Sequence, residues 1–202
     1  IRDRFYPGHI TLPAAQQADA LKSVGVVVTD TLAALRHAGL DAPIVSGGST
    51  PTSRQSHLIP HLTEIRPGTY VYNDVSMNDG GWCEAADCAA TVLCTVVSDA
   101  VPGKRIVDAG SKTLAADRHN LRPDTAGYGR LVGHPEARIV RLTEEHGEID
   151  VSACPEPPAI GSRVHVVMNH VCPCVNLHSR VWFLEIDGSL SPLDIDARGM
   201  VQ

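Results

Sequence analysis

The pattern of apolar residues changes near residue 80, and this change limits the fold more than any other feature of the sequence. Before it, stretches with helical spacing alternate with short extended stretches. The stretch from Pro13 to Ala38 carries apolar residues at helical spacing and stops at Gly39, and a short strand is expected at Pro43 to Ser46. We therefore expect residues 1–80 to form part of an α/β layer or barrel.

Further short elements are expected before residue 80. Ser53 to Leu58 is compatible with a helix. Leu62 to Arg66 and Tyr70 to Tyr72 read as extended, with a turn at Pro67-Gly68 between them.

After Trp82, β-branched and apolar stretches are separated by Gly and Pro turns, which is typical of antiparallel strands. We expect residues 81–202 to form an antiparallel β domain such as a small barrel, with Asp117 to Gly127 as a loop. The expected strands are Thr91–Ser98, Arg105–Ala109, Ala137–Leu142, Arg163–Met168, Val181–Ile186 and Leu190–Ile195.

Composition excludes several classes of partner. The net charge of -6 argues against a nucleic-acid or anionic-membrane partner, and 4% aromatic residues argue against stacking on single-stranded bases. No apolar run approaches the roughly 20 residues that span a bilayer. The six cysteines are clustered and no signal peptide precedes them, so we expect a reduced, cytoplasmic protein. The opening residues are neither a targeting segment nor a tag, so we expect the chain to start inside a larger protein.

The stretch from Asn169 to Leu177 contains the strongest candidate for a metal site. His170 and Cys172 are two residues apart, a spacing that places both side chains on one face of an extended strand. Imidazole and thiolate together favour zinc, and two protein ligands leave positions open for substrate. A buried histidine beside a small apolar cysteine explains the same spacing. A four-ligand zinc knot that adds Cys174 and His178 is a further alternative.

Other segments carry groups that bind anions or transfer protons, but each is weak by itself. Glycine and hydroxyl side chains in Ser46 to Thr52 follow a strand, and such turns hold anions through backbone amides. Similar tight turns occur at Glu64–Tyr70 and Asp108–Lys112, and Phe5–His9 combines a phenol with an imidazole. Five histidines in polar surroundings are expected to be exposed, namely His37, His57, His61, His119 and His134.

Taken in order, these motifs resemble one enzyme family. The order Tyr-Pro-Gly-His, Ser-Gly-Gly-Ser-Thr-Pro-Thr, Arg-Pro-Gly-Thr-Tyr, Asp-Ala-Gly-Ser-Lys and Asn-His-Val-Cys-Pro-Cys-Val-Asn-Leu is similar to that of the D-threonine aldolase / D-serine dehydratase family. The resemblance implies pyridoxal phosphate (PLP) enzymes of the alanine racemase fold type. It also implies the C-terminal part of a PLP-binding (β/α)8 (TIM) barrel over residues 1–80, followed by an antiparallel β domain with the metal-binding motif over residues 81–202.

The resemblance assigns roles to the N-terminal motifs. Tyr6 would lie beside the cofactor, and His9 would act as a catalytic base. The cofactor phosphate would be held by hydroxyl and backbone groups of two turns, Ser49, Thr50, Thr52, Gly68 and Thr69. The family often has Asn where Thr69 stands, which leaves the side-chain contribution of Thr69 open.

The resemblance makes His170 and Cys172 the metal ligands. Zinc is the expected ion, with Mn²⁺ or another divalent metal as the alternative. Aldolases of the family tend to have aspartate at the second position, so Cys172 favours a dehydratase of D-serine or 3-hydroxyaspartate. Retro-aldol cleavage of the D-threonine aldolase type is the alternative within the family, a racemase-like relative is disfavoured by the paired metal ligands, and a non-catalytic zinc-stabilised β module is the alternative of another class.

One expected component is missing from these residues. PLP enzymes need a lysine that forms a Schiff base with the cofactor. The only lysines are Lys22, Lys104 and Lys112, and none matches the family's position. A complete (β/α)8 barrel also takes about 250 residues. We therefore expect a C-terminal fragment, inactive alone, of a homodimeric lyase that acts on a small-molecule β-hydroxy-D-amino acid.

Overall fold

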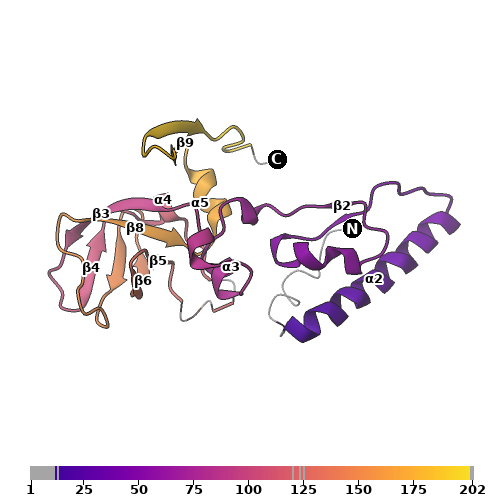
Figure 1. Cartoon of the computed structure of the whole chain (residues 1–202), viewed down its shortest axis with the longest axis horizontal. Coiled ribbons are helices and arrows are strands. Elements are labelled where there is room, and N and C mark those ends of the chain that lie inside the picture. The colour runs from indigo at the N-terminus through magenta and orange to yellow at the C-terminus, as the bar shows by residue number, and fades with distance from the viewer. Residues whose placement is uncertain (1–11, 13, 120, 123, 125, 201–202) are drawn as a thin grey trace. The chain divides into compact units, whose positions relative to one another are not determined.

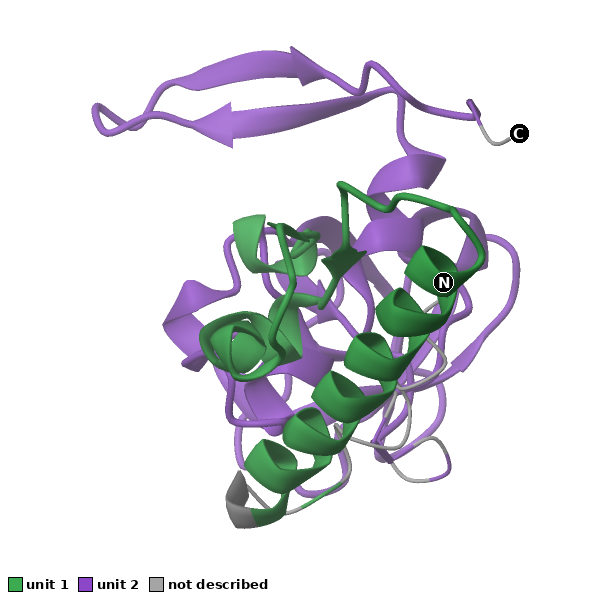
Figure 2. Cartoon of the chain, turned by 90° about the vertical axis from the view of Figure 1, so that its right-hand side faces the viewer, with its two compact units in different colours: residues 1–71 green, residues 72–202 purple. Residues whose placement is uncertain are grey.

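The chain forms two compact units, Ile1–Val71 and Tyr72–Gln202, which are coloured separately in Figure 2. The computed structural model describes residue 12 and residues 14–119, 121–122, 124 and 126–200. Because the two units are not placed relative to one another, each is described by itself.

The first unit is built on one long helix, α2 (Ala14–His37), which confirms the predicted helix (Figure 1). It ends before Gly39, whose φ of 72° suits a helix terminus. The helix packs against the 3-10 helix η1 (Thr50–Leu58), and Gly25 allows this because a Cβ there would lie 2.6 Å from Pro60. Leu21 and Leu32 of α2 are buried.

Two short parallel strands, β1 (Ser46–Gly47) and β2 (Glu64–Ile65), complete the first unit together with the 3-10 helix η2 (Thr69–Val71). The first strand therefore begins where the predicted strand at 43–46 ends. The predicted extended segment at 70–72 is wrong, because Tyr70 and Val71 lie in η2 and Tyr72 lies in a turn. The amide of Val71 bonds to the carbonyl of Gly68 at 3.3 Å, so a local turn satisfies this backbone and no sheet partner is needed.

The second unit is a closed antiparallel barrel with strand order β3-β4-β7-β6-β5-β8. Apolar side chains alternate along the strands and fill the interior, with Val96, Ile139, Ile149 and Val166 almost fully buried. The strands are β3 (Val92–Ser98), β4 (Lys104–Val107), β5 (Gly129–Leu131), β6 (His134–Leu142), β7 (Gly147–Asp150) and β8 (Arg163–Met168).

Short elements surround the barrel. Strands β9 (Arg180–Leu184) and β10 (Leu190–Asp194) pair into a separate antiparallel hairpin, visible near the C-terminus in Figures 1 and 2. The remaining elements are α3 (Val75–Asp79), η3 (Ala85–Asp87), α4 (Ser111–Leu114) and α5 (Val171–Leu177).

The predicted class, α/β followed by antiparallel β, is confirmed, and each of the six predicted strands overlaps an observed one. Strands β5 and β7 were not predicted because they span only three and four residues and each begins with glycine. The division into a barrel part at 1–80 and a β domain at 81–202 stays a prediction. Within the described part of the chain, no helix is long and apolar enough to cross a membrane.

Candidate functional site

His170 and Cys172 lie where strand β8 passes into helix α5. His170 is the residue immediately before the helix, with extended backbone (φ -138°, ψ 111°), and Cys172 lies in the first turn. The two residues therefore do not share one extended strand, which is the geometry that the spacing argument assumed. Pro173 suits the first turn of a helix, and this sequence signal was overlooked.

A buried carboxylate determines where α5 begins. Asp74 Oδ2 accepts a hydrogen bond from the Val171 amide at 3.0 Å, and Asp74 Oδ1 accepts one from the Met77 amide at 2.9 Å. Burial raises the pKa of Asp74, and these backbone hydrogen bonds oppose that effect. One side chain thus caps α3 and α5 together. The Asn-Asp pair before Val75 is a helix-start signal that could have identified Asp74 from the sequence.

The side chains of His170 and Cys172 meet at the surface. They are hydrogen-bonded to each other, and His170 Nδ1 lies 2.7 Å from Asp117 Oδ2. The bond with Cys172 raises the pKa of His170 to about 9; burial opposes this and the bond with Asp117 adds to it. Because Asp117 occupies Nδ1, the Nε2 atom and the Cys172 sulfur remain as a pair of soft metal ligands. The donor set therefore fits a zinc ion.

Within the part of the chain that the structure describes, the pair has no third ligand of the usual types. Among the described residues, no group of three His, Cys, Asp or Glu side chains is arranged around a common metal position. Such a two-ligand site leaves coordination positions open for substrate or water, as reaction chemistry requires.

The alternative four-ligand knot does not form. The Cys174 thiol donates to the Thr113 carbonyl at 3.2 Å, and His178 Nε2 lies 3.0 Å from the same oxygen. Burial raises the pKa of Cys174 to about 11, which keeps it a thiol at neutral pH. Cys174 and His178 therefore anchor α5 to α4 and do not extend the ligand pair.

The loop that carries Asp117 is held from within by His119. This side chain is fully buried, so the prediction that it is exposed is wrong. Its Nδ1 accepts hydrogen bonds from the Leu121 and Arg122 amides, both at 3.0 Å. Burial lowers the pKa of His119, which keeps it neutral as this acceptor role demands. Of the other histidines predicted to be exposed, His37, His57 and His61 are exposed and His134 is partly buried.

Asp79 at the end of α3 ties the same loop to the barrel. Its carboxylate lies 3.0 Å from His119 Nε2, accepts from Arg130 at 3.0 Å and also accepts from Arg122. Burial raises the pKa of Asp79, but the hydrogen bonds and charges of Arg130 and Arg122 outweigh it and lower the pKa below its ordinary value. Asp79 and Asp117 were both missed by the sequence analysis, and no local pattern marks them.

In the first unit, the two turns predicted to hold the cofactor phosphate lie side by side. The Tyr70 amide donates to Thr50 Oγ1 at 3.2 Å, which joins the turn of Ser49 to Thr52 with the turn of Gly68 and Thr69. Thr52 Oγ1 accepts from the Ser49 amide at 3.0 Å and so shapes the first turn. The space beside Gly68 is open, since a Cβ there would have no neighbour within 4 Å. The structure thus brings all five predicted phosphate-binding residues into one region, and their role stays a prediction.

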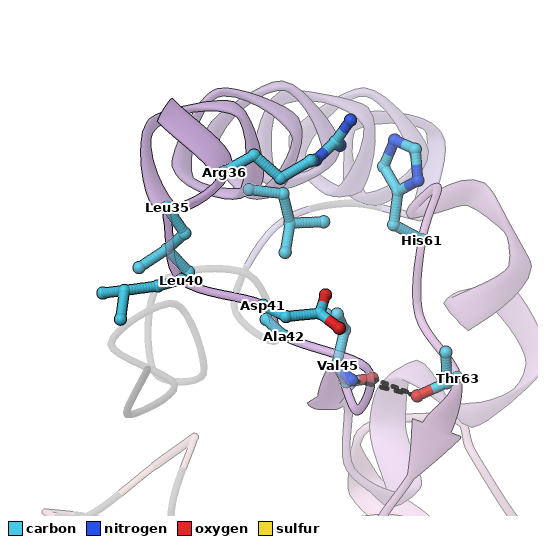
Figure 3. Close-up of a pocket in the computed structure, with 9 residues that line it drawn as sticks. Leu35, Arg36, Leu40, Asp41, Ala42, Val45, His61 and Thr63 are labelled. Atoms are coloured by element: carbon cyan, nitrogen blue, oxygen red, sulfur yellow. Dashed lines mark hydrogen bonds between the residues drawn. The ribbon is translucent and has the colours of Figure 1, made fainter. Parts of the chain in front are cut away.

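Two predicted residues, Tyr6 and His9, lie outside the described part of the chain. A pocket of about 270 Å³ lies elsewhere in the first unit, at the C-terminal end of α2 (Figure 3). Its lining includes Arg36, Asp41 and His61, and none of the predicted phosphate-binding residues.

The Asp-Ala-Gly-Ser-Lys motif has a structural explanation. A Cβ at Gly110 would lie 2.3 Å from the Glu144 carbonyl oxygen, so only glycine permits this approach. Lys112 forms an exposed ion pair with Glu145 at 2.5 Å.

Comparison with known proteins identifies relatives of this fold. The family model described as "Putative serine dehydratase domain" matches residues 89–184. D-threo-3-hydroxyaspartate dehydratase from Delftia sp. (strain HT23) is 36% identical over 173 residues, covering 78% of this chain and 45% of the relative. An uncharacterized protein of Mycobacterium tuberculosis is 41% identical over 108 residues, covering 52% of this chain and 79% of the relative.

Solved structures of similar enzymes superpose on this chain. Two mutants of D-threo-3-hydroxyaspartate dehydratase superpose with TM-scores of 0.78 and 0.75 at 28% and 29% identity, each over 93% of this chain and about half of the other. In one a histidine is replaced by alanine, and in the other, in a metal-free form, a cysteine two positions further on. D-threonine aldolase from Filomicrobium marinum gives 0.74 at 26% identity over 93% of this chain and 50% of that one.

An alanine racemase-like protein from Idiomarina loihiensis, 24% identical with a TM-score of 0.77, shares the fold over 93% of this chain and 53% of its own. The chain spans about half the length of the dehydratase relative and of these solved structures. It belongs to the serine dehydratase-like family of the alanine racemase fold, together with D-threo-3-hydroxyaspartate dehydratase and D-threonine aldolase.

Proposed function

We propose that this chain belongs to a PLP- and zinc-dependent lyase that dehydrates a β-hydroxy-D-amino acid such as D-serine or 3-hydroxyaspartate. The observation that carries the proposal is the hydrogen-bonded pair of His170 and Cys172 at the start of α5. The two dehydratase mutants support it, because they replace a histidine and a cysteine with the same spacing, and the cysteine mutant is metal-free.

The ligand types favour zinc over Mn²⁺ or another divalent ion, because thiolate and imidazole are softer than carboxylate. When bound, PLP supplies an electron sink at the substrate Cα and zinc a Lewis acid for the β-hydroxyl group. His170 and Cys172 would hold the metal, and the surface position of Cys172 leaves this site accessible.

The cofactor phosphate would be held in the first unit by Ser49, Thr50, Thr52 and the backbone of Gly68 and Thr69. The bond from Tyr70 to Thr50 supports this because it makes the two turns one surface of amides and hydroxyls.

Two residues outside the described part of the chain complete the proposed site. Tyr6 would contact the cofactor. His9 would serve as the base in the alternative reaction, retro-aldol cleavage to glycine and an aldehyde.

The observation in support of that alternative is the likeness to D-threonine aldolase. Cys172 supports the dehydratase over it, in line with the sequence resemblance. A non-catalytic zinc-stabilised β module has less support, because Cys174 and His178 both engage the Thr113 carbonyl.

We propose that the Schiff-base lysine lies outside these 202 residues. All three lysines form ion pairs, Lys22 with Asp19, Lys104 with Glu148 and Lys112 with Glu145. The chain alone would then be inactive, and the whole enzyme would act in the cytoplasm as a homodimer. Borohydride reduction after incubation with PLP should give no stoichiometric adduct at any one of these lysines.

A product assay on the full-length protein tests the function. With D-serine or D-threo-3-hydroxyaspartate we expect a 2-oxo acid and ammonia, and loss of this turnover in Cys172→Ala but not in Cys154→Ala. Glycine and an aldehyde would favour the aldolase, and metal-independent turnover in Cys172→Ala would refute the assigned site.

A further inference from the structure

We propose that Asp117 is a positioning residue of the metal site, whose carboxylate fixes the ring of His170 so that Nε2 is the nitrogen presented to the metal. This inference rests on the proposed role of His170 and Cys172 as ligands. It adds a third residue, 53 positions before His170 in the chain, that acts through His170 and does not contact the metal.

The contact between the two side chains determines which nitrogen is available. His170 Nδ1 and Asp117 Oδ2 are 2.7 Å apart, a short charge-assisted hydrogen bond. A carboxylate only accepts, so the ring must carry its proton on Nδ1 at this contact. The lone pair of a neutral imidazole then lies on Nε2, and the carboxylate makes that nitrogen a stronger donor to a metal.

The backbone around the two residues is fixed as well. Asn169, the residue before His170, donates from Nδ2 to the Asp117 carbonyl at 3.4 Å and to the Gly127 carbonyl at 2.5 Å. Asn169 is almost fully buried, with 1% of its surface exposed. The Asn169 side chain therefore holds the Asp117 backbone next to His170, in addition to the contact between the Asp117 and His170 side chains.

The described part of the loop after Asp117 is anchored to the barrel. His119 is fully buried and accepts the Leu121 and Arg122 amides, while Arg122 and His119 both approach Asp79. Asp117 therefore lies on an anchored loop. This matters because the Asp117 carboxylate can orient the His170 ring only if the Asp117 backbone is itself held in place.

Zinc affinity separates a positioning role from a structural one. Affinity is measured by competition with a chromophoric chelator at fixed pH for the wild type, Asp117→Ala, Asp117→Asn and His170→Ala. We expect Asp117→Ala to bind zinc about 10 to 100 times more weakly, as is typical when the partner of a histidine ligand is removed. Asp117→Asn should fall in between, because an amide oxygen still accepts from Nδ1 without the charge.

Asp124→Ala is the matched control. Asp124 lies on the same loop with 88% of its side chain exposed, and it forms a 3.6 Å ion pair with Arg118. Its loss should leave zinc affinity within twofold. Nitrogen NMR of the His170 ring in the zinc-loaded protein adds a readout that stability alone would not move. The Nδ1 proton should be slow to exchange in the wild type and in Asp124→Ala, and fast in Asp117→Ala.

The outcomes distinguish this inference from the proposed function. If His170→Ala loses zinc but Asp117→Ala keeps wild-type affinity and a protected Nδ1 proton, the metal site stands and the role of Asp117 is overturned. If the wild type binds no zinc, both are overturned. An equal loss in Asp117→Ala and Asp124→Ala would mean a general effect of loop charge and would also overturn it.

Discussion

The Asp79 carboxylate in the second unit interacts with three other side chains. Arg130, Arg122 and His119 all approach it, and only 13% of its side chain is exposed. Two arginines hold its pKa below the ordinary value despite burial. Such a group stabilises the folded state only while it is ionised.

Acid should therefore weaken the fold through Asp79. Its folded pKa is lower than its unfolded pKa, so its contribution is present above about pH 4 and is lost as the pH falls through the folded value. Asp79→Asn should be less stable at pH 7, and the difference from the wild type should shrink towards pH 3. Urea unfolding at a series of pH values measures this. Parallel pH curves for the two proteins would contradict it, and exposed Asp99→Asn is the control.

For single residues, the sequence predicted which side chains are candidate ligands better than it predicted their burial and their partners. His170 and Cys172 were selected by type and spacing, and they do meet. His119 could not be recognised as buried, because its partner Asp79 lies 40 residues earlier and joins it only through the fold. Asp117 was missed for the same reason.

Helices α3 and α5 depend on one shared cap. They have five and seven residues, too short to be stable by themselves. The Asp74 carboxylate accepts one amide from each, and 1% of its surface is exposed. The start of α5, and with it the position of Cys172, follows from this buried contact.

Removing the cap should destabilise the second unit. Asp74→Ala leaves two buried amides without acceptors, at a cost of about 2–4 kcal/mol in the free energy of unfolding. Exposed Asp99→Ala should change it by less than about 0.5 kcal/mol. Urea unfolding monitored by tryptophan fluorescence reports on this unit, because Trp82 and Trp182 both lie in it. Equal stability of the two variants would show that Asp74 is not the cap that fixes α5.

The predictability of the elements follows their length and their dependence on distant partners. Helix α2 and strands β3 and β8 have long, regular patterns and were predicted nearly to the residue. The start of α5 was not predicted, because the buried acceptor that caps it is about 100 residues away and the signal of Pro173 was overlooked. The sequence contains no local sign of that contact.

The hairpin of β9 and β10 exposes apolar side chains on a sheet of only two strands. Trp182 and Phe183 are 63% and 57% exposed. Isolated two-stranded sheets are marginal in water, so a further surface would stabilise this one. The proposed homodimer predicts that a second copy of the chain supplies it.

Light scattering on the full-length protein tests this. The wild type should be a dimer, and a Trp182→Ser, Phe183→Ser double variant should be mostly monomeric at micromolar concentration. Val101→Ser, which removes a 53% exposed apolar side chain from a barrel turn, should remain dimeric. A stable dimer of the double variant would rule out the hairpin as the contact.

The fold class of the whole molecule could be predicted from the sequence, but the pairing of its strands could not. Strand signals separated by turns indicated an antiparallel domain, whereas closure of the barrel requires β3 to pair with β8, about 70 residues later. Pairing at such a separation leaves no pattern in the strands themselves. The resemblance to a known family contributed what periodicity could not, namely the expectation that the turns around Thr50 and Gly68 bind the cofactor phosphate.

Zinc stoichiometry tests the central claim most directly, namely that His170 and Cys172 form an open metal site. The zinc content after dialysis is measured for the wild type, for Cys172→Ala and for a Cys174→Ala, His178→Ala double variant. We predict one zinc per chain in the wild type and in the double variant, and none in Cys172→Ala. Zinc retained by Cys172→Ala and lost from the double variant would contradict the account.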